Sequence, residues 1–524
     1  MLTPILAVLL ITYLISAALT LVVRVLAPRV GLTDHPDERR KLHRRAIPLG
    51  GGVAVFLATV LVLGGLLLID NPWQAGLRQC GRELFGLLAA GMIIVLVGLV
   101  DDRVGLRGRH KILGQLLAVS ILVANGLTIN RLGILGEHFE LGMLAIPFTY
   151  FWLLGATNSI NLLDGIDGLA SMLGIVLVST FAIMAWFVGQ TEIALVSLVF
   201  AGSLLGFIRF NFPPASIFLG DAGSMLIGLV VGALAIQGSM KGSGTVLLAA
   251  PLAVWTLPIL DCTAAILRRK LTGRSIYATD RGHLHHHLLQ RLGNERRVLA
   301  ILTACSLLTS LAALVSLVYR TDWVGFAIGP AVVAVFIATG VFGRAESLLL
   351  VRRLRSLGHS FLRLSHNGKP NGNGHLAGWK SAIRWQGSGD WEGLWSMLVS
   401  KVDEWGLTYV RFDVNLPMLH EGYTSTWERP YCDDTRPRWN LEIPLLVAEQ
   451  RFGHVAAQGY AAEDATCHDV GQLLEIIKFC ESYVHGFIEE KRRDQRQASP
   501  ADAGIQVINR TSPPEMAPEG AKVL

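Results

Sequence analysis

Long runs of apolar residues, separated by short polar segments, dominate the first two thirds of this 524-residue chain. A helix needs roughly 20 such residues to cross a hydrocarbon core of about 30 Å, because it rises about 1.5 Å per residue. The pattern therefore predicts an all-α polytopic membrane domain of about eleven transmembrane helices. We expect these helices near residues 2–26, 48–69, 84–100, 112–128, 143–157, 172–188, 192–208, 223–237, 246–267, 298–318 and 323–342.

The composition supports this interpretation, because 52% of the residues are hydrophobic and only 16% are charged. A soluble globular chain carries about 25% charged residues. The run at residues 2–26 lacks the short apolar core and small-residue cleavage site of a signal peptide, so we expect it to be retained as a helix. The six cysteines form no C-x-x-C pair and indicate neither a disulfide framework nor a cysteine zinc site.

The charges of the connecting segments predict the orientation of the domain. The segments at 27–47, 101–111 and 268–297 are rich in Lys and Arg, whereas the alternate connections are short or poor in both. The positive-inside rule places the basic segments in the cytoplasm. An odd number of spans then places the N-terminus outside and the C-terminal region inside.

After residue 343 the character of the chain changes. A stretch rich in Arg, Gly, Asn and His predicts a linker, and the residues after it predict a cytoplasmic α+β domain whose tryptophans pack a small core. No motif in this domain identifies a ligand. The expected parts are a linker at 344–380, the domain at 381–490 with helices at 391–405 and 468–490 and alternating runs at 407–416 and 439–460, and a disordered tail at 491–524.

Polar side chains recur at the helix ends assigned to the cytoplasm. Asp101 and Asp102 end the third span, the segment 158–168 ends the fifth, Asp221 opens the eighth, and histidines at 283–287 lie in the longest basic loop. Ionisable groups at membrane depth are costly and usually mark a function. One charged pair would be an ordinary interfacial anchor, but four groups from separate spans on one side favour a shared site.

The residue types in these groups indicate a particular chemistry. Carboxylate and amide oxygens suit Mg²⁺, which takes one or two carboxylates together with substrate phosphates. The arginines and lysines of the same loops suit phosphate oxygens. The sequence therefore predicts a diphosphate substrate held by Mg²⁺ at the membrane surface. We expect Asp164 and Asp167, three residues apart, to share one face of a helical turn, and the alternative is a pair of Asx-Gly turns.

The histidine segment allows three interpretations. It is either a zinc site, although neither Cys nor Glu completes a usual ligand set nearby, or a solvated loop. In the third interpretation its imidazoles, together with Arg281, bind phosphate or a base in a nucleotide pocket. The acidic groups elsewhere in the chain favour the third interpretation.

Five motifs in residues 1–343 together resemble those of the polyprenyl-phosphate N-acetylhexosamine-1-phosphate transferases. This family includes the bacterial undecaprenyl-phosphate GlcNAc-1-phosphate transferases and the MraY-type phospho-MurNAc-pentapeptide transferases. The His-x-His-His form looks like the GlcNAc-1-phosphate branch. The motifs are Asp34-x-Pro36 with Arg40-Lys41-x-His43 and Pro48-Leu-Gly-Gly51; Asp101-Asp102 with Arg109-His-Lys111; Asn158-x-x-Asn161-x-x-Asp164-Gly-x-Asp167-Gly168; Phe218-Leu-Gly-Asp221-x-Gly-Ser224; and His283-Leu-His285-His286.

The resemblance implies an enzyme that transfers GlcNAc-1-phosphate from UDP-GlcNAc to undecaprenyl phosphate, releases UMP and starts a cell-envelope polysaccharide. It implies a multi-pass protein of the bacterial inner membrane whose site faces the cytoplasm. It is compatible with a homodimer and implies no nucleic-acid partner. The implied cofactor is Mg²⁺, with Mn²⁺ as a substitute, on Asn161 and Asp221. The implied catalytic residues are Asp101, Asp102, Lys111 and Asp164, and the implied substrate-binding residues are Lys41, His43, Asn158, Asp167, Arg281, His283, His285 and His286.

The family pattern leaves two roles open for Asp101. It either orients and deprotonates the lipid phosphate or acts as a covalent nucleophile. A phosphate monoester has a second pKa of about 6 and is mostly dianionic at neutral pH, so it hardly needs a strong base. We therefore rank the orienting role above the covalent one.

Four other functions compete with this interpretation. A transferase of MraY type would share the chemistry but recognise a peptide-bearing sugar, and a transferase of another specificity would use a different UDP-N-acetylhexosamine. A secondary transporter would carry its charged groups near the bilayer midplane, on broken helices in repeated halves. A metal-dependent lipid-diphosphate hydrolase would need no UDP-sugar.

Overall fold

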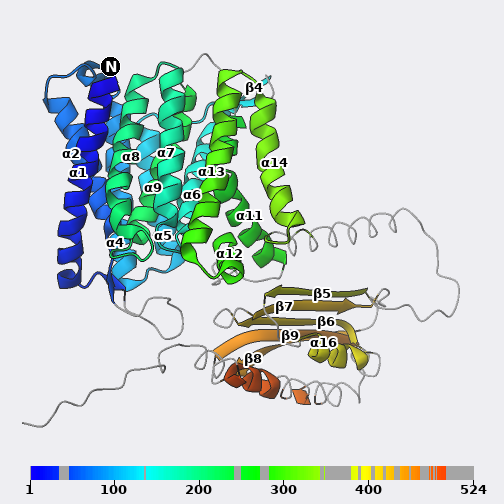
Figure 1. Ribbon diagram of the computed structural model, residues 1–524. Coiled ribbons are helices and arrows are strands. Elements are labelled where there is room, and N and C mark those ends of the chain that lie inside the picture. The colour runs from blue at the N-terminus through cyan, green and yellow to red at the C-terminus, as the bar shows by residue number, and fades with distance from the viewer. Residues whose placement is uncertain are drawn as a thin grey trace, which may run out of the picture. The chain divides into compact units, whose positions relative to one another are not determined.

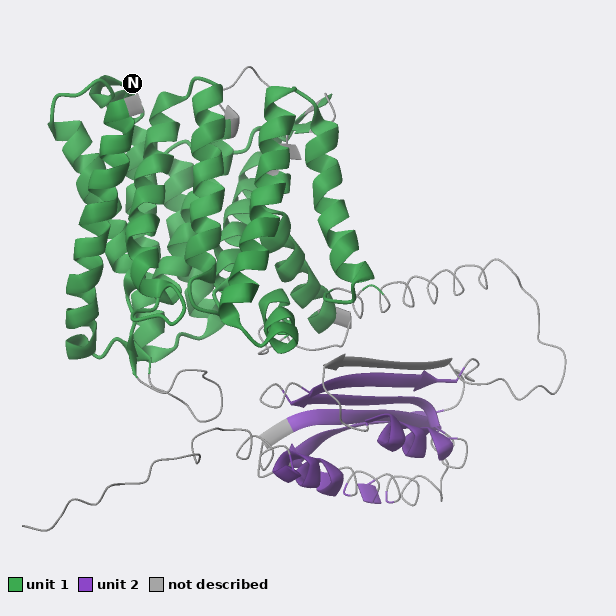
Figure 2. Cartoon of the chain, viewed as in Figure 1, with its two compact units in different colours: residues 1–372 green, residues 373–524 purple. Residues whose placement is uncertain are grey.

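Two compact units make up the chain, residues 1–372 and 373–524 (Figure 2). In the computed structural model, the first unit is a bundle of helices and the second is built around a sheet. The described residues are 2–34, 46–134, 137–240, 249–271, 282–342, 347, 379–386, 391–402, 407–416, 421–429, 437–447, 450–460, 471, 474–475, 478 and 481–490.

Eight helices among the described residues of the first unit are long and apolar enough to cross a membrane, which confirms a polytopic membrane protein. Three further segments belong to the same unit, namely α5 (Gly108–Ala124), the broken pair α10 (Ala249–Val254) and α11 (Thr256–Leu271), and α14 (Asp322–Ala338). Figure 1 shows α5, α11 and α14 within the bundle. The eight are α1 (Leu2–Leu26), α2 (Gly51–Leu68), α4 (Gly81–Val104), α6 (Ala145–Leu163), α7 (Leu169–Phe187), α8 (Thr191–Asn211), α9 (Gly220–Met240) and α13 (Glu295–Val318).

The junction between α6 and α7 differs from the prediction. Helix α6 continues to Leu163, one to two turns beyond the expected end at residue 157, because its last amide side chains find partners inside the bundle. The expected helical turn shared by Asp164 and Asp167 is wrong. Asp164 caps the end of α6, and Gly168 takes a left-handed conformation with φ of 75° immediately before α7, so both carboxylates lie in a loop.

Helix α9 lies at the centre of the bundle and packs against α2, α4, α6, α7 and α8. Its neighbours approach closely because glycines face it: a Cβ on Gly98 of α4 would fall 2.2 Å from the Cα of Ala222, and one on Gly52 of α2 would fall 2.3 Å from the amide of Gly223. Small residues let membrane helices approach until their backbones touch. The start of α9 is therefore fixed against two other helices.

Short elements in the connections complete the first unit. Two pairs of antiparallel strands lie there, β1 (Thr33–Asp34) with β2 (Ile47–Pro48) and β3 (Arg131–Ile134) with β4 (Glu137–Glu140). The all-α prediction missed them because strands this short show no alternating pattern. The remaining short helices are η1 (Ala27–Val30), α3 (Gln74–Gln79), η2 (Gly142–Leu144) and α12 (Leu284–Leu292).

The second unit contains a five-stranded antiparallel sheet in the order β5-β7-β6-β9-β8, together with α16 (Trp391–Ser400) and a helical stretch at 481–490. Trp391, Trp395 and Trp427 are buried in its core, which confirms their predicted packing role. The predicted run at 439–460 is a hairpin of two strands. The strands are β5 (Trp379–Gln386), β6 (Leu407–Leu416), β7 (Glu421–Glu428), β8 (Arg438–Val447) and β9 (Gln450–Tyr460).

Most of the predicted linker at 344–380 and the whole predicted tail at 491–524 lie outside the described residues. Strand β5 begins at Trp379, within the last two residues assigned to the linker.

Candidate functional site

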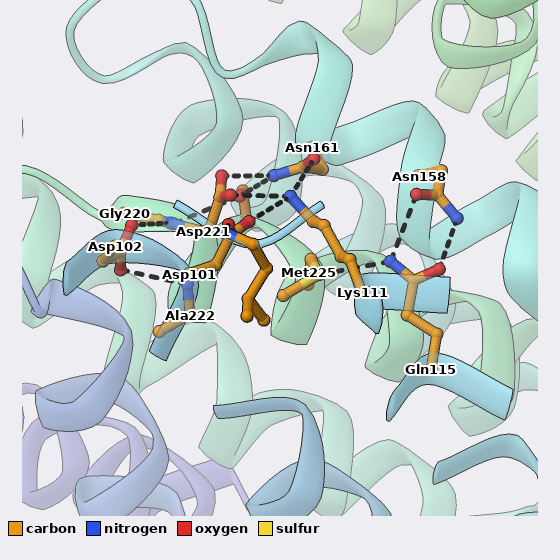
Figure 3. Close-up of polar contacts among 12 residues, drawn as sticks. Asp101, Asp102, Lys111, Gln115, Asn158, Asn161, Gly220, Asp221, Ala222 and Met225 are labelled. Carbon is orange, nitrogen blue, oxygen red and sulfur yellow. Dashed lines mark hydrogen bonds and ion pairs between the residues drawn. The ribbon is translucent and has the colours of Figure 1, made fainter. Parts of the chain in front are cut away.

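Asp101, Lys111, Asn161 and Asp221 come from the ends of four helices. Figure 3 shows their side chains in contact with one another. The Nζ atom of Lys111 lies 2.6 Å from Asp221 Oδ2, 2.9 Å from Asp101 Oδ2 and 3.1 Å from Asn161 Oδ1. Three oxygens from three helices thus converge on one cation. The sequence predicted all four residues, and the fold places them in direct contact.

The tight return between α4 and α5 positions Asp101 and Lys111. Asp101 lies in the last turn of α4 and Lys111 in the first turn of α5. The other oxygen of Asp101, Oδ1, accepts a hydrogen bond of 2.6 Å from the amide of Leu106 in the connecting loop. Asp101 therefore has one oxygen bound to its own loop and one oxygen bound to Lys111. We call Asp101, Lys111, Asn161 and Asp221 the cluster.

Asp102 holds the N-terminus of α9. Its carboxylate accepts hydrogen bonds from the backbone amides of Asp221 at 2.8 Å and Ala222 at 3.4 Å. These two amides would otherwise lack partners, because they lie at the start of a helix. A Cβ at Gly220, whose φ is 72°, would lie 2.5 Å from Asp102 Oδ2, so only glycine fits there. The side chain of Asp102 thus fixes the position of Asp221 by binding the backbone amide of Asp221.

The amide of Asn161 has a defined orientation. Its Nδ2 donates to Asp221 Oδ1 at 2.7 Å and to Ser224 Oγ at 2.9 Å, both on the first turn of α9. Since the nitrogen satisfies these acceptors, the oxygen is the atom that faces Lys111. Asn161 therefore presents a hard oxygen to the cluster.

A second amide, Asn158, is paired in both directions with Gln115 of α5 (Figure 3). Gln115 Nε2 donates to Asn158 Oδ1 at 3.1 Å, and Asn158 Nδ2 donates to Gln115 Oε1 at 2.8 Å. Gln115 is fully buried and follows Lys111 by one helical turn, just as Asn158 precedes Asn161 by one. This pair sets the register of α5 against α6. The sequence analysis missed Gln115, whose only signal was its spacing from Lys111.

The loop between α6 and α7 adds two carboxylates. Asp167 Oδ2 accepts a 2.8 Å hydrogen bond from the amide of Ala215, which joins this loop to the one before α9. Asp164 accepts no hydrogen bond from the described residues. Burial and the charges of Asp221, Asp102 and Asp167 raise the pKa of Asp164 well above its ordinary value. The site thus holds more carboxylates than the one lysine neutralises.

The histidine segment divides into buried and accessible rings. His283 and His285 are 5% and 1% exposed, whereas His286 and His287 are half-buried. The Nε2 atom of His285 lies so close to Gly165 that a Cβ there would collide with it, so the segment contacts the loop between α6 and α7. Burial lowers the pKa of His285 to about 4.

Two of the predicted motifs meet beside Asp221. The amide of Phe218 donates to the carbonyl of Pro48 at 2.9 Å, and the amides of Gly51 and Gly52 donate to Phe218 and Leu219 at 3.0 Å. The motif before α2 therefore pairs with the motif that opens α9. Lys41, His43 and Arg281 lie outside the described residues.

Metal-binding capacity follows from the mixed donor set. Within the described ranges, no group of three or more His, Cys, Asp or Glu side chains is arranged to hold a metal ion. The convergent donors are instead two carboxylates, Asp101 and Asp221, and the amide oxygen of Asn161. The sequence analysis also missed Asp261 of α11, which contacts His283.

Comparison with known proteins identifies relatives along the membrane domain. Residues 84–239 match the family described as glycosyl transferase family 4. The chain is 34% identical to a probable undecaprenyl-phosphate N-acetylglucosaminyl 1-phosphate transferase of Bacillus subtilis, over 57% of the chain and 80% of the relative.

Two further relatives carry related names. A decaprenyl-phosphate N-acetylglucosaminephosphotransferase of Mycobacterium tuberculosis is 34% identical, over 53% of the chain and 74% of the relative. A phospho-N-acetylmuramoyl-pentapeptide-transferase of Enterococcus hirae is 31% identical, over 53% of the chain and 87% of the relative.

Proposed function

The chain belongs to glycosyl transferase family 4, as a polyprenyl-phosphate N-acetylhexosamine-1-phosphate transferase, and we propose that its substrates are UDP-GlcNAc and undecaprenyl phosphate. Two relatives at 34% identity, both named for N-acetylglucosamine transfer, support this donor. The product is the lipid-diphosphate-linked sugar that starts a cell-envelope polysaccharide.

The convergence of Asp101, Asn161 and Asp221 on Lys111 is the observation that carries the proposal. In the proposed reaction, an oxygen of the lipid phosphate forms a bond to the β-phosphorus of UDP-GlcNAc. The bond between that phosphorus and the bridging oxygen breaks, and UMP leaves with the electron pair. Such a transfer depends mainly on positioning and charge neutralisation. Lys111 supplies a fixed positive charge for the phosphate oxygens.

The donor set fits Mg²⁺ or Mn²⁺. Two carboxylates and an amide oxygen are hard ligands, and Mg²⁺ combines a few such ligands with substrate phosphates. Asp164, which accepts no hydrogen bond from the described residues, adds a further carboxyl group nearby. We assign Asn161 and Asp221 as the residues that hold the ion. When bound, the ion would neutralise charge on the diphosphate.

The remaining roles follow from the contacts. Asp102 and Asn158 both use their polar atoms on neighbouring helices, so we propose that they position Asp221 and Asn161. Asp101 orients the lipid phosphate. Lys41, His43, Asp167, Arg281 and the histidine segment contact the donor substrate, and His286 is one of the two half-buried imidazoles of that segment.

We also propose the orientation that the loop charges indicate. The chain crosses the bacterial inner membrane about eleven times, with its N-terminus outside. The cluster then faces the cytoplasm, where nucleotide sugars are available.

Membranes that contain the protein test this proposal when they are supplied with a panel of UDP-sugars. We expect UMP release from UDP-GlcNAc that requires both Mg²⁺ and undecaprenyl phosphate. UMP release without lipid phosphate would instead indicate a hydrolase, and no release from any UDP-N-acetylhexosamine would contradict the proposal.

One relative favours a second donor. The Enterococcus hirae protein is named for a MurNAc-pentapeptide substrate and is nearly as similar as the others, at 31% identity. Release of UMP only from UDP-MurNAc-pentapeptide would assign the chain to that branch.

A further inference from the structure

Helix α11 carries a buried carboxylate that none of the five motifs includes. Asp261 is fully buried. Its Oδ2 lies 2.8 Å from His283 Nδ1, and its Oδ1 accepts a 2.7 Å hydrogen bond from the amide of Leu284. A buried charge in a membrane domain is costly and is usually kept for a function.

The two contacts of Asp261 have different consequences. Leu284 is the first residue of α12, so one oxygen satisfies a free amide at the start of that helix. The other oxygen can only accept a hydrogen bond, so His283 must carry its proton on Nδ1. Asp261 therefore fixes both the rotation of the His283 ring and its tautomer.

The orientation of His283 passes to the rest of the histidine segment. The ring of His283 stacks on that of His285, with centroids 5.8 Å apart and planes 5° from parallel. The ring centroids of His285 and His286 lie 4.2 Å apart, and the ring of His285 touches Gly165 in the loop between α6 and α7. The half-buried ring of His286 is thus held through two buried rings.

A second residue of α11 contacts the same segment. Arg268 is 3% exposed and lies against Gly282, where a Cβ would fall 2.3 Å from its guanidinium carbon. Arg268 lies seven residues, about two turns, after Asp261 on the same helix. Helix α11 therefore supports the segment at two points, of which Asp261 makes the directional contacts.

We propose that Asp261 is a positioning residue for the transfer reaction. Through its contact with His283, Asp261 holds the histidine segment in the orientation that receives the UDP-sugar. The inference rests on the proposed function, in which this segment contacts the donor substrate. Asp261 itself touches no substrate in this proposal.

The substitution Asp261→Asn tests the proposal with little change of shape. The amide oxygen can still accept the hydrogen bond from Leu284, but the amide nitrogen now faces Nδ1 and requires the opposite tautomer of His283. We expect the KM for UDP-GlcNAc to rise about 10- to 100-fold, by analogy with the loss of affinity or activity when the hydrogen-bond partner of a metal-ligating histidine is removed. We also expect a changed pH profile, which a purely structural role would leave unchanged.

A double-mutant cycle with His283→Gln shows whether the effect passes through His283. The double variant should lose no more activity than the poorer single variant, because both remove the same contact. Asp322→Asn is the matched control, since Asp322 is 6% exposed at the start of α14 and its side chain forms no hydrogen bond with a motif residue among the described residues. Unchanged kinetics for Asp261→Asn, or additive losses in the cycle, would overturn the inference.

Two additional measurements keep the test decisive. If Asp261→Asn cannot be purified, His283→Asn should retain more activity than His283→Gln. The amide nitrogen of asparagine lies about where Nδ1 lies in histidine and can still donate to Asp261, whereas that of glutamine lies one bond farther from the backbone. The reverse order would contradict the proposal. Modification by diethyl pyrocarbonate, mapped by mass spectrometry, needs no activity. We expect His283 and His285 to be protected in the unsubstituted protein and modified in Asp261→Asn. Equal rates would overturn the inference, whereas a protein that shows this change but uses no UDP-sugar would refute the proposed function alone.

Discussion

Asp101 divides its oxygens between the amide of Leu106 and the ammonium of Lys111. An oxygen held in an ion pair at 2.9 Å is well placed to orient a phosphate beside the same lysine. To act as a nucleophile, it would have to leave that pair and approach the β-phosphorus. The contacts therefore support the orienting role.

The substitution Asp101→Asn separates these two roles. If Asp101 only orients and helps to deprotonate the lipid phosphate, the variant should lose about 10²- to 10⁴-fold in rate but remain active. Its activity should rise with pH through about 6, because the phosphate must then lose its second proton unaided. UMP release measured from pH 5 to pH 9 checks this, with Glu137→Gln, an exposed carboxylate in β4, as the control. Absence of activity at every pH in a folded variant would favour the nucleophile.

His285 predicts a pH dependence of stability. Burial lowers its pKa to about 4, below the ordinary value of 6.5, so between these values the unfolded chain binds a proton that the folded protein excludes. This contribution to stability is complete above pH 6.5, declines as the pH falls and is lost near pH 4, for a total on the order of 3 kcal/mol. We expect the thermal unfolding midpoint to fall between pH 7 and pH 5, and to fall less in His285→Gln.

His287→Gln is the matched control for this measurement, because His287 lies on the same helix but is half-buried beside Phe342. It should keep the slope of the unsubstituted protein. An equal slope in all three proteins would show that His285 does not cause the pH dependence.

At the scale of single residues, the sequence identified the residues that form the cluster but not the residues that support them. Asp101, Lys111, Asn161 and Asp221 fell within motifs of recognisable spacing. Gln115 and Asp261 were missed, because one polar residue in an apolar helix gives no sign of its partner. Those partners are distant in sequence and become neighbours only when the helices pack.

The helix packing explains why the chain has glycine where α4 meets α9. The ideal Cβ position on Gly98 overlaps the backbone of Ala222, immediately after Asp221. Any side chain there must push the start of α9 away from α4. Since Asp101 and Asp221 lie on these two helices, such a shift would separate the oxygens that contact Lys111.

The substitution Gly98→Leu should therefore reduce both stability and activity. Overpacking of this kind typically costs about 1–3 kcal/mol, and displacement of a catalytic group by about 1 Å can cost about 100-fold in rate. UMP release and the thermal unfolding midpoint in detergent measure the two effects. Gly64→Leu is the control, because a Cβ at this glycine of α2 meets no atom within 4 Å. Equal activity in the two variants would show that the close approach does not set the geometry of the site.

The hydrophobic pattern located the helices well but placed their polar ends poorly. It ended the fifth helix at residue 157, whereas α6 continues through Asn158 and Asn161 to Leu163. Hydropathy records only the cost of placing an amide in lipid, and that cost disappears when Gln115 or Asp221 supplies a partner. The helix extension and the site therefore have the same cause, which is pairing between helices.

Across the whole molecule, the contacts that build the cluster lie within the first unit. Helices α2, α4, α5, α6 and α9 supply or hold its polar groups, and α11 and α12 hold the histidine segment. All of these elements precede residue 293. The sheet of the second unit has a separate core formed around Trp391, Phe412 and Trp427. We therefore propose that residues 1–343 form the catalytic domain and that the domain at 381–490 has a regulatory or assembly role.

Removal of residues 344–524 tests this division of labour. We expect the truncated protein to insert into membranes and to release UMP from UDP-GlcNAc with unchanged kcat and KM, because the contacts described for the cluster all join residues that the truncated protein keeps. The measurement compares membranes that contain equal amounts of the two proteins, with Asp221→Asn in the full-length chain as the inactive reference. If the truncated protein is present at an equal level but inactive, the second unit contributes to catalysis. Unchanged kinetics with altered polymer output in cells would instead place its role after the transfer step, in the delivery of the lipid-linked sugar.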